Sequence, residues 1–348
     1  MIKVAINGLG RIGKSVLRII LKSDNIEIVA INEINKNIEN IAYILNYDTT
    51  YGNLDDKFHK IDDLTIANSK QQIKVYTCDN ICELDFKNLN IDALIDSSGS
   101  KSSFEYAQSI LSQNIIKAVF LTHPSKHADI NLIFGVNEHN LDPTVHKLIS
   151  TSSCNATALA PILEILDKNF GIEVGEITTI HPFLSHQKVL DGGCIGNTDR
   201  EVVCNFEFGR SSSHNMIPAK TTTIEACEMA NPKFNSEIFG ANSFRVPTQT
   251  VGAINASFIL KSQIDIDEVK DLFLVAESLQ KIKIIKNNFE PLVSSDFKGE
   301  EFSAIIDHRF SDVKLKKLLK LVVWYDNEWG YASKVVQAVE YYFFRNQF

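Results

Sequence analysis

The sequence predicts an α/β protein in which a parallel sheet with crossover helices is followed by an α+β region with a mostly antiparallel sheet. The length of 348 residues is enough for about two domains. In the first half, short apolar runs alternate with helical patterns, and this alternation is typical of a parallel sheet. In the second half the strand-like stretches become longer and helical segments separate them, which favours an α+β domain.

Four apolar runs in the first half are interpreted as buried strands of the parallel sheet. They lie at 4–6, 28–31, 93–96 and 118–121. Helical patterns occupy 11–21 and about 104–113. Because crossover connections are right-handed, we expect the loops that follow these strands to meet at one edge of the sheet.

Longer strands are expected in the second half of the chain. They lie at 176–180, 243–246, 252–260 and 320–325. A helix is expected over 267–279, and a final helix over about 331–344.

Composition and charge exclude several classes of protein. Apolar residues make up 44% and charged residues 22% of the chain, which is ordinary globular usage. The net charge is −8, so the chain is poorly suited to neutralise a phosphate backbone, and no nucleic-acid partner is expected. The mean hydropathy is −0.05, and no apolar run approaches the ~20 residues of a membrane span, so no membrane partner is expected.

Cysteine usage points to a reducing compartment. The six cysteines are scattered without the paired spacing of metal ligands, and no metal is expected. The first residues show no charged segment followed by a long apolar one, so we see no signal peptide. These observations favour free thiols and a cytoplasmic location.

A glycine-rich turn follows the first predicted strand. Gly8, Gly10 and Gly13 fit the pattern G-x-G-x-x-G, with Arg11 and Ile12 before the last glycine, and the turn opens a helix. In the dinucleotide-binding fingerprint the first glycine permits the tight turn and the second lets the backbone approach a pyrophosphate. The third lets helix and strand pack closely.

Glu33 stands twenty residues after Gly13, at the end of the second predicted strand. A carboxylate there accepts hydrogen bonds from ribose hydroxyls and repels a 2′-phosphate, which favours NAD over NADP. The competing interpretation is a glycine-rich turn with an unrelated surface glutamate. With strand, turn, helix and carboxylate all in place, we predict a Rossmann-type NAD-binding domain.

Cys154 and His181 form a candidate nucleophile and base. Cys154 lies at or just before the start of an apolar-periodic helix, where free backbone N–H groups and the helix dipole stabilise a thiolate. His181 follows the predicted strand at 176–180, and a thiolate beside an imidazole is an activated nucleophile. Spacing alone leaves open a buried structural cysteine and a core histidine, which are the commoner arrangement.

Seven stretches occur in the order and at the spacing found in one enzyme family. They lie at 5–13, 46–52, 153–154, 178–181, 215–218, 244–248 and 324–331. On these motifs the chain resembles the glyceraldehyde-3-phosphate dehydrogenase family along essentially its whole length. The last motif, Trp-Tyr-Asp-Asn-Glu-Trp-Gly-Tyr, is highly specific.

The resemblance implies an activity and an organisation. It implies NAD-dependent oxidation of a phosphorylated aldehyde through a thioester, in a homotetramer. Residues 1–153 with 327–348 would form the NAD-binding Rossmann domain, to which the C-terminal helix returns. Residues 154–326 would form the catalytic and oligomerisation domain.

The resemblance also implies roles for individual residues. Cys154 resembles the nucleophile and His181 the base. The cofactor-binding residues would be Gly8, Gly10, Arg11, Ile12, Gly13, Glu33, Thr122, Asn327 and Tyr331, where Asn327 fixes the nicotinamide carboxamide. The substrate-binding residues would be Ser153, Thr221 and Arg245. An arginine suits a phosphate because its fork gives bidentate, charge-assisted hydrogen bonds, although a structural ion pair is the competing interpretation for Arg245.

Several positions depart from the glycolytic pattern of the family. Asn155 replaces the hydroxyl residue that follows the nucleophile, and Ala158 replaces a second cysteine. Leu184 stands where the family has a phosphate-binding threonine. Thr222 replaces the glycine of the phosphate loop, with Lys220 just before that loop. The segment 182–217 is longer than in the family.

Two alternatives follow from these departures. Erythrose-4-phosphate dehydrogenases are close relatives that also carry an apolar residue at the place of Leu184 and lack the loop glycine, and they hydrolyse the thioester to a free acid. A non-catalytic NAD-binding homologue is an alternative of another class, supported by the weakened anion site alone. The Cys154 and His181 pair argues against it, because a binding module needs neither.

Overall fold

The computed structural model describes residues 1–193 and 206–345, and the chain divides into two compact units. Unit 1 comprises Met1–Leu132, His139–Ser152 and Ala332–Phe348. Unit 2 comprises Ile133–Glu138 and Ser153–Tyr331. Each unit is built around a sheet of its own.

The sheet of unit 1 has nine strands within the described part of the chain, in the order β3-β4-β5-β2-β1-β6-β7-β9-β8. The pairs that β4 forms with β3 and β5 are antiparallel, and the other pairs are parallel. The strands are β1 (Ile2–Asn7), β2 (Ile26–Asn32), β3 (His59–Asp62), β4 (Thr65–Ala67), β5 (Gln72–Tyr76), β6 (Ala93–Asp96), β7 (Ala118–Leu121), β8 (Ile130–Asn131) and β9 (Leu148–Ser150).

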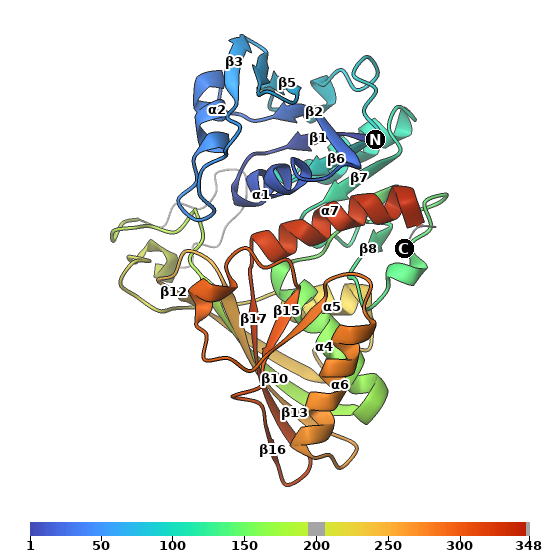
Figure 1. Ribbon diagram of the computed structural model, residues 1–348, viewed down its shortest axis with the longest axis vertical. Helices are drawn as coiled ribbons and strands as arrows, with labels where there is room; N and C mark the ends of the chain where they lie inside the picture. The colour runs from blue at the N-terminus through green and yellow to red at the C-terminus, as the bar shows by residue number, and fades with distance from the viewer. Residues whose placement is uncertain (194–205, 346–348) are drawn as a thin grey trace. The chain divides into compact units, whose positions relative to one another are not determined.

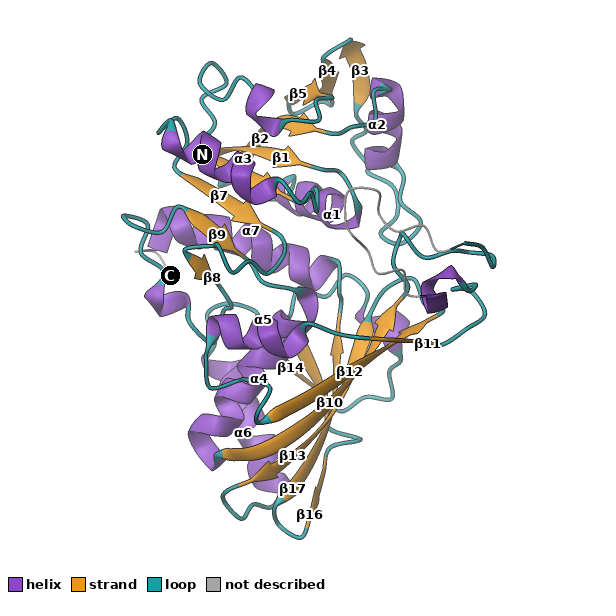
Figure 2. Cartoon of the chain, turned by 180° about the vertical axis from the view of Figure 1, so that it is seen from behind, coloured by secondary structure: helices purple, strands orange, loops and turns teal. Residues whose placement is uncertain are grey.

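Helices cover both faces of this sheet. They are α1 (Arg11–Ile20), α2 (Ile38–Asn46) and α3 (Ser103–Ser112), with short turns η1 (Ile81–Glu83) and η2 (Glu138–Asn140). Figures 1 and 2, which view the chain from opposite sides, show α1 and α3 on opposite faces of the sheet. Ala107 and Ile110 of α3 pack against Leu94 and Val119, which are buried because both faces of a parallel sheet are covered.

The sheet of unit 2 has eight strands among the described residues, in the order β11-β12-β10-β13-β17-β15-β14, with β16 paired to β17. The pairs β10–β12 and β14–β15 are parallel and the others are antiparallel. The strands are β10 (Ile172–Pro182), β11 (Ile217–Ala219), β12 (Phe239–Val246), β13 (Gly252–Leu260), β14 (Ile285–Asn288), β15 (Ala304–Asp307), β16 (Asp312–Lys314) and β17 (Leu318–Tyr325).

Helices of unit 2 cover one face of its sheet. They are α4 (Cys154–Phe170), α5 (Thr223–Ala230) and α6 (Ile266–Leu279), with short turns η3 (Phe206–Gly209) and η4 (Ser294–Phe297). Figures 1 and 2 both show α4 and α6 on the same side of the strands. Leu159 and Leu163 of α4 are buried with Ile177, Ile254 and Phe258 of the sheet in one core. The last helix, α7 (Trp329–Phe344), begins at the end of unit 2 and belongs to unit 1 from Ala332 onward.

The structure confirms the predicted fold class and every predicted element, with changes at the ends. Strand β10 continues through Pro182, so His181 lies inside the strand. Helix α7 begins two residues earlier than predicted. Helices α2 and α5, the β3–β4–β5 meander and the strands β8, β9, β11, β14, β15 and β16 were not predicted from the sequence. Among the described residues, no helix is long and apolar enough to cross a membrane.

Candidate active site

The nucleophile turn lies between β9 and α4. Cys154 is the first residue of α4, and Ser153 caps the helix because its Oγ accepts the backbone N–H of Ala156 at 3.3 Å. Ser152, two residues before the cysteine, has φ +62, a left-handed conformation that is uncommon for residues other than glycine. This sharp turn presents the partly buried thiol at the start of the helix, as the sequence predicted.

His181 faces the thiol from the end of β10. Its Nε2 lies 3.7 Å from Cys154 Sγ. Its Nδ1 lies 2.7 Å from the carbonyl oxygen of Pro182, which only accepts, so Nδ1 carries the proton. The lone pair of Nε2 is therefore directed at the thiol, as a general base requires.

Arg245 lies beside His181 on the neighbouring parallel strand, because the register pairs His181 with Arg245. The Nε and Nη1 atoms of Arg245 are buried without a hydrogen-bond partner among the described residues. Burial lowers the pKa of this guanidinium, while Cys154 and Tyr325 act in the opposite direction. A structural ion pair for Arg245 is thus not present in the described part of the chain, and its donors are available to an anion.

Burial sets the charge of the nucleophile and base. It raises the pKa of the Cys154 thiol to about 11, although Arg245 and backbone N–H groups at the helix start act in the opposite direction. It lowers the pKa of His181 to about 3, with a further contribution from Arg245. Burial therefore favours the thiol over the thiolate and the neutral imidazole over the imidazolium, and it acts against the helix N-terminus on which the expectation of a thiolate rests.

Asn155 connects the nucleophile turn to the loop before α5. Its Oδ1 accepts the hydroxyl of Tyr325 at 2.7 Å, and its Nδ2 donates to Thr223 Oγ1 at 3.2 Å. Thr223 Oγ1 lies 2.6 Å from Thr221 Oγ1. Thr221 therefore joins the nucleophile turn through side chains, which its position in the sequence did not reveal.

The motif at 324–331 holds a second strained turn. Oδ1 of Asn327 accepts the backbone N–H of Val251 at 3.0 Å and the hydroxyl of Thr250 at 3.3 Å. Val251 has φ +66, which is costly for a β-branched residue. Nδ2 of Asn327 makes no hydrogen bond to the described residues, so it remains able to bind a carboxamide oxygen. Tyr331 is buried near the start of α7.

The glycines of unit 1 have distinct steric environments. Gly8 has φ +86, and a Cβ there would lie 2.7 Å from the Cα of Ser98. A Cβ on Gly13 would lie 2.0 Å from the carbonyl oxygen of Gly8 and 2.6 Å from Ser97 Oγ. At Gly10 a Cβ would meet nothing within 4 Å. Gly8 and Gly13 are thus required by packing, whereas Gly10 leaves space beside the helix start, as a bound pyrophosphate needs.

The remaining predicted cofactor residues of unit 1 lie beside the glycine turn, on α1 or at the end of a neighbouring strand. Glu33 accepts the backbone N–H of Leu9 at 2.8 Å, so its carboxylate lies against the glycine turn. Thr122, directly after β7, donates its hydroxyl to the carbonyl of Asp96 at 3.1 Å. Ile12 lies half-buried on α1.

Asp48 holds two cations of α1, a contact that the sequence analysis missed. Arg11 and Lys14 contact its carboxylate at 2.5 and 3.0 Å. Despite burial, these cations and the backbone N–H of Tyr51 hold the pKa of Asp48 well below its usual range. The side chain of Arg11 is therefore engaged within unit 1. The motif at 46–52, which carried the resemblance, was the signal for this contact.

The other residues that differ from the family pattern lie in different environments. The backbone N–H of Leu184 donates to Gln187 Oε1 at 2.7 Å. Lys220 and Thr222 are exposed. Cys194, Cys204 and the charged residues at 199–201 lie outside the described residues.

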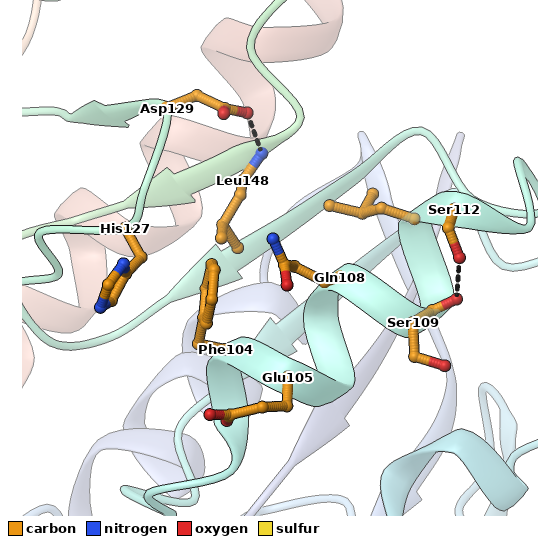
Figure 3. Close-up of a pocket in the computed structure, with 9 residues that line it drawn as sticks. Phe104, Glu105, Gln108, Ser109, Ser112, His127, Asp129 and Leu148 are labelled. Carbon is orange, nitrogen blue, oxygen red and sulfur yellow. Dashed lines mark hydrogen bonds between the residues drawn. The ribbon is translucent and has the colours of Figure 1, made fainter.

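A groove of about 580 Å³ on unit 1 contains none of the predicted site residues. Figure 3 shows it between α3 and the segments that carry His127 and Leu148. Phe104 stacks on His127 with ring centroids 4.5 Å apart. This groove runs along α3 and contains no residue of the glycine turn.

Comparison with known proteins matches both units. The family domain described as "Glyceraldehyde 3-phosphate dehydrogenase, NAD binding domain" matches residues 2–103, and the C-terminal domain of that family matches residues 153–327. Glyceraldehyde-3-phosphate dehydrogenase 2 of Bacillus subtilis is 32% identical over 98% of this chain and 96% of its own length. A chloroplastic glyceraldehyde-3-phosphate dehydrogenase of Arabidopsis thaliana is 34% identical (97% and 78%), and a cytosolic one of Craterostigma plantagineum 33% identical (98% and 98%).

With an NAD-binding domain matched within unit 1 and a thiol facing an imidazole in unit 2, the chain is an NAD-dependent oxidoreductase. Relatives above 30% identity cover nearly all of the chain. It therefore belongs to the glyceraldehyde-3-phosphate dehydrogenase family, and its substrate is a phosphorylated aldehyde.

Proposed function

We propose that this chain oxidises glyceraldehyde 3-phosphate with NAD through a thioester on Cys154, with His181 as the base and Arg245 as the main ligand of the substrate phosphate. The observation that carries the proposal is the guanidinium of Arg245, which is buried with two nitrogen atoms unpaired among the described residues. A buried cation without a partner is costly, and a phosphate supplies the charge-assisted hydrogen bonds that it lacks. The same cation lies close enough to affect the pKa values of Cys154 and His181.

The resting protonation states define the first step. Sγ of Cys154 forms a bond to the aldehyde carbon while Nε2 of His181 takes the thiol proton, so no free thiolate is needed beforehand. The carbonyl π bond opens onto oxygen, and the imidazolium returns its proton there to give a hemithioacetal. His181 is then neutral again and takes the hydroxyl proton as the carbon is oxidised to the thioester.

NAD, when bound, supplies the acceptor for the hydride that leaves the hemithioacetal carbon. The residues of unit 1 fit such a dinucleotide. Gly10 leaves open space at the N-terminus of the ten-residue helix α1, and the carboxylate of Glu33 lies against the same turn. In unit 2, Nδ2 of Asn327 is available to a carboxamide.

Oxidation of the aldehyde is tested by NADH formation with glyceraldehyde 3-phosphate in the wild type and in Arg245→Leu. We expect saturable kinetics in the wild type. In Arg245→Leu we expect KM to rise by about 10²-fold or more, as for loss of a charge-assisted pair, with Cys154 alkylation retained. An unchanged KM would remove Arg245 from the substrate site.

A second candidate is the hydrolytic reaction of erythrose-4-phosphate dehydrogenases. Its support is the loss of anion donors around the thiol. Asn155 replaces a hydroxyl and is bound to Tyr325 and Thr223, and the backbone N–H of Leu184 is bound to Gln187. With few donors for a free phosphate, water becomes the acyl acceptor.

The acyl acceptor is identified by measuring NADH formation with each of the two aldehydes, with and without inorganic phosphate. Under the hydrolytic candidate, phosphate stimulates turnover weakly or not at all, and the product is a free acid. A steep, saturable rise from near zero with an acyl phosphate as product would instead assign the phosphorylating reaction. The preferred substrate is the aldehyde with the larger kcat/KM.

We further propose a cytoplasmic homotetramer. Its support is the sheet face of unit 2 opposite the helices, where Val174, Ile180, Phe244, Ile259 and Leu318 are each about 40% exposed. Adjacent apolar side chains of this kind mark an interaction surface. Light scattering at micromolar concentration tests it: we expect the mass of four chains, and a monomeric mass would refute the assembly.

A further inference from the structure

Four side chains from three parts of unit 2 form one hydrogen-bonded chain beneath the thiol. Tyr325 ends β17, Asn155 lies in the first turn of α4, and Thr223 begins α5 directly after Thr221 and Thr222. Tyr325, Asn155 and Thr223 are 1%, 8% and 1% exposed, whereas Thr221 is half-buried. These hydrogen-bonded side chains therefore run from the protein interior to a half-buried threonine.

The first two hydrogen bonds of this chain run in the same direction. The hydroxyl of Tyr325 donates to Asn155 Oδ1 at 2.7 Å, and Nδ2 of Asn155 donates to Thr223 Oγ1 at 3.2 Å. Thr223 Oγ1 and Thr221 Oγ1 lie 2.6 Å apart, a hydrogen bond in which either hydroxyl can be the donor; after accepting from Asn155, Thr223 keeps its own proton to donate to Thr221. The backbone N–H of Thr223 also donates to Thr221 Oγ1, at 3.3 Å.

With Thr223 as the donor of the hydroxyl pair, Thr221 Oγ1 receives two hydrogen bonds and its own proton is left to donate. No other described residue accepts that proton. Successive hydrogen bonds of one direction polarise each other, which strengthens the last donor of the series. An asparagine suits position 155 because its side chain has an acceptor at one end and a donor at the other.

We propose that Asn155 and Thr223 are positioning residues that fix the Thr221 hydroxyl as a hydrogen-bond donor to a phosphate oxygen of the substrate. The inference rests on the proposed function in one respect, that Thr221 contacts the phosphorylated aldehyde. It assigns a purpose to Asn155, a departure from the family pattern. In this proposal neither Asn155 nor Thr223 touches the substrate phosphate, and both act on it through Thr221; Asn155 Oδ1 also accepts the Cys154 thiol at 3.5 Å.

The test compares KM and kcat for glyceraldehyde 3-phosphate at saturating NAD. Thr223→Val keeps the shape of the side chain and removes its hydroxyl, so KM should rise about tenfold, as for a lost hydrogen bond to a charged group, with kcat within about twofold. Thr223→Ser should restore a near-wild-type KM because the hydroxyl returns. Thr157→Val is the matched control, since Thr157 is a buried threonine of α4 whose Oγ1 has no hydrogen-bond partner among the described residues; its KM should stay unchanged.

The decisive arm is the double variant. If Thr223 acts through Thr221, Thr221→Val alone raises KM about as much as Thr223→Val, and Thr221→Val with Thr223→Val raises it no further. Multiplied effects in the double variant, or an unchanged KM in Thr223→Val alone, would overturn the proposal. If Thr223→Val acted only by loosening the loop, Thr223→Ser would not restore KM, and that result would also overturn the proposal.

Failure of this inference can be distinguished from failure of the proposed function. An unchanged KM in Thr221→Val would remove Thr221 from the substrate site and overturn this inference, while turnover through Cys154 remained intact. Loss of the proposed function itself would appear as a wild-type chain that forms no NADH from the aldehyde.

Discussion

The glycine turn of unit 1 and the nucleophile turn of unit 2 both lead from a strand into a helix, but they are held in different ways. In the first, Gly8 and Gly13 are required because a Cβ would collide with neighbouring atoms. In the second, Cys154 lies 3.7 Å from His181 of β10, and Arg245 of β12 and Tyr325 of β17 are near enough to interact with it electrostatically. The first turn forms because glycines have no side chain that would collide with the neighbouring backbone. The second depends on side chains that come from distant parts of the sequence.

Of the changes at the nucleophile turn, removal of the thiol should reduce turnover most. Cys154→Ser should abolish turnover, a loss of about 10⁴-fold or more, because a hydroxyl has too high a pKa to replace a thiol nucleophile. NAD binding should stay nearly unchanged, since the glycine turn is untouched. Steady-state NADH formation and NAD titration by fluorescence measure the two quantities, and wild-type turnover would mean that the nucleophile is misassigned.

Removal of the base should have a smaller effect. His181→Asn keeps a hydrogen-bond donor and removes the proton acceptor, so a loss of about 10²–10⁴-fold in kcat is expected. The variant should still bind NAD. A kcat equal to that of the wild type would exclude His181 as the base.

In the glycine turn, a substitution should reduce the stability of the fold because the added side chain collides with backbone atoms. Gly13→Ala places a Cβ 2.0 Å from the carbonyl of Gly8, so we expect unfolding free energy to fall by about 3 kcal/mol or more. Gly10→Ala is the matched control, because its Cβ meets open space and stability should change by less than about 1 kcal/mol. Urea denaturation compares the two, and equal losses would contradict the steric account.

How far each region could be predicted follows from this difference. Gly8, Gly13 and Glu33 all lie in the first 33 residues and their spacing encodes a local geometry, so the sequence alone could predict their positions at the turn. The partnership of Cys154 with Arg245 depends on the register between β10 and β12, which no local pattern records. The family resemblance identified these residues in advance.

Two features of the nucleophile region could not be predicted from the sequence. The pKa of Cys154 depends on how completely the fold removes solvent, and a helix start alone suggested the opposite direction. The hydrogen bonds of Asn155 join it to residues 68 and 170 positions away in the chain. Both arise only when unit 2 packs.

Buried neutral histidines should make the chain sensitive to acid. Burial lowers the pKa of His181 to about 3 and that of His308 to about 4. Because the unfolded state binds a proton near pH 6.5 and the folded state does not, stability is full above that pH and falls below it. At pH 5 each histidine costs about 2 kcal/mol relative to pH 8.

His308→Gln isolates one of these contributions. The variant should lose less unfolding free energy between pH 8 and pH 5 than the wild type, by about 2 kcal/mol. Urea midpoints at several pH values measure this slope. Identical slopes would show that His308 does not titrate on unfolding.

The smallest expected effect concerns the preference for NAD over NADP, which depends on Glu33 beside the glycine turn. Glu33 should make NAD better than NADP by at least about tenfold in kcat/KM, because its carboxylate repels a 2′-phosphate. Glu33→Gln keeps an acceptor for the N–H of Leu9 and removes the charge, so the preference should narrow. Comparable kcat/KM values for NAD and NADP in the wild type would contradict the role of Glu33.

The claim that Cys154 carries the acyl group is tested most directly by trapping the intermediate. The chain is mixed with NAD and glyceraldehyde 3-phosphate without inorganic phosphate, quenched in acid within the first turnover and examined by peptide mass spectrometry. The account predicts one acyl group per chain on the peptide that contains Cys154 and none on Cys78, Cys82 or Cys227. NADH formation without acylation of Cys154, or with acylation of another cysteine, would contradict it.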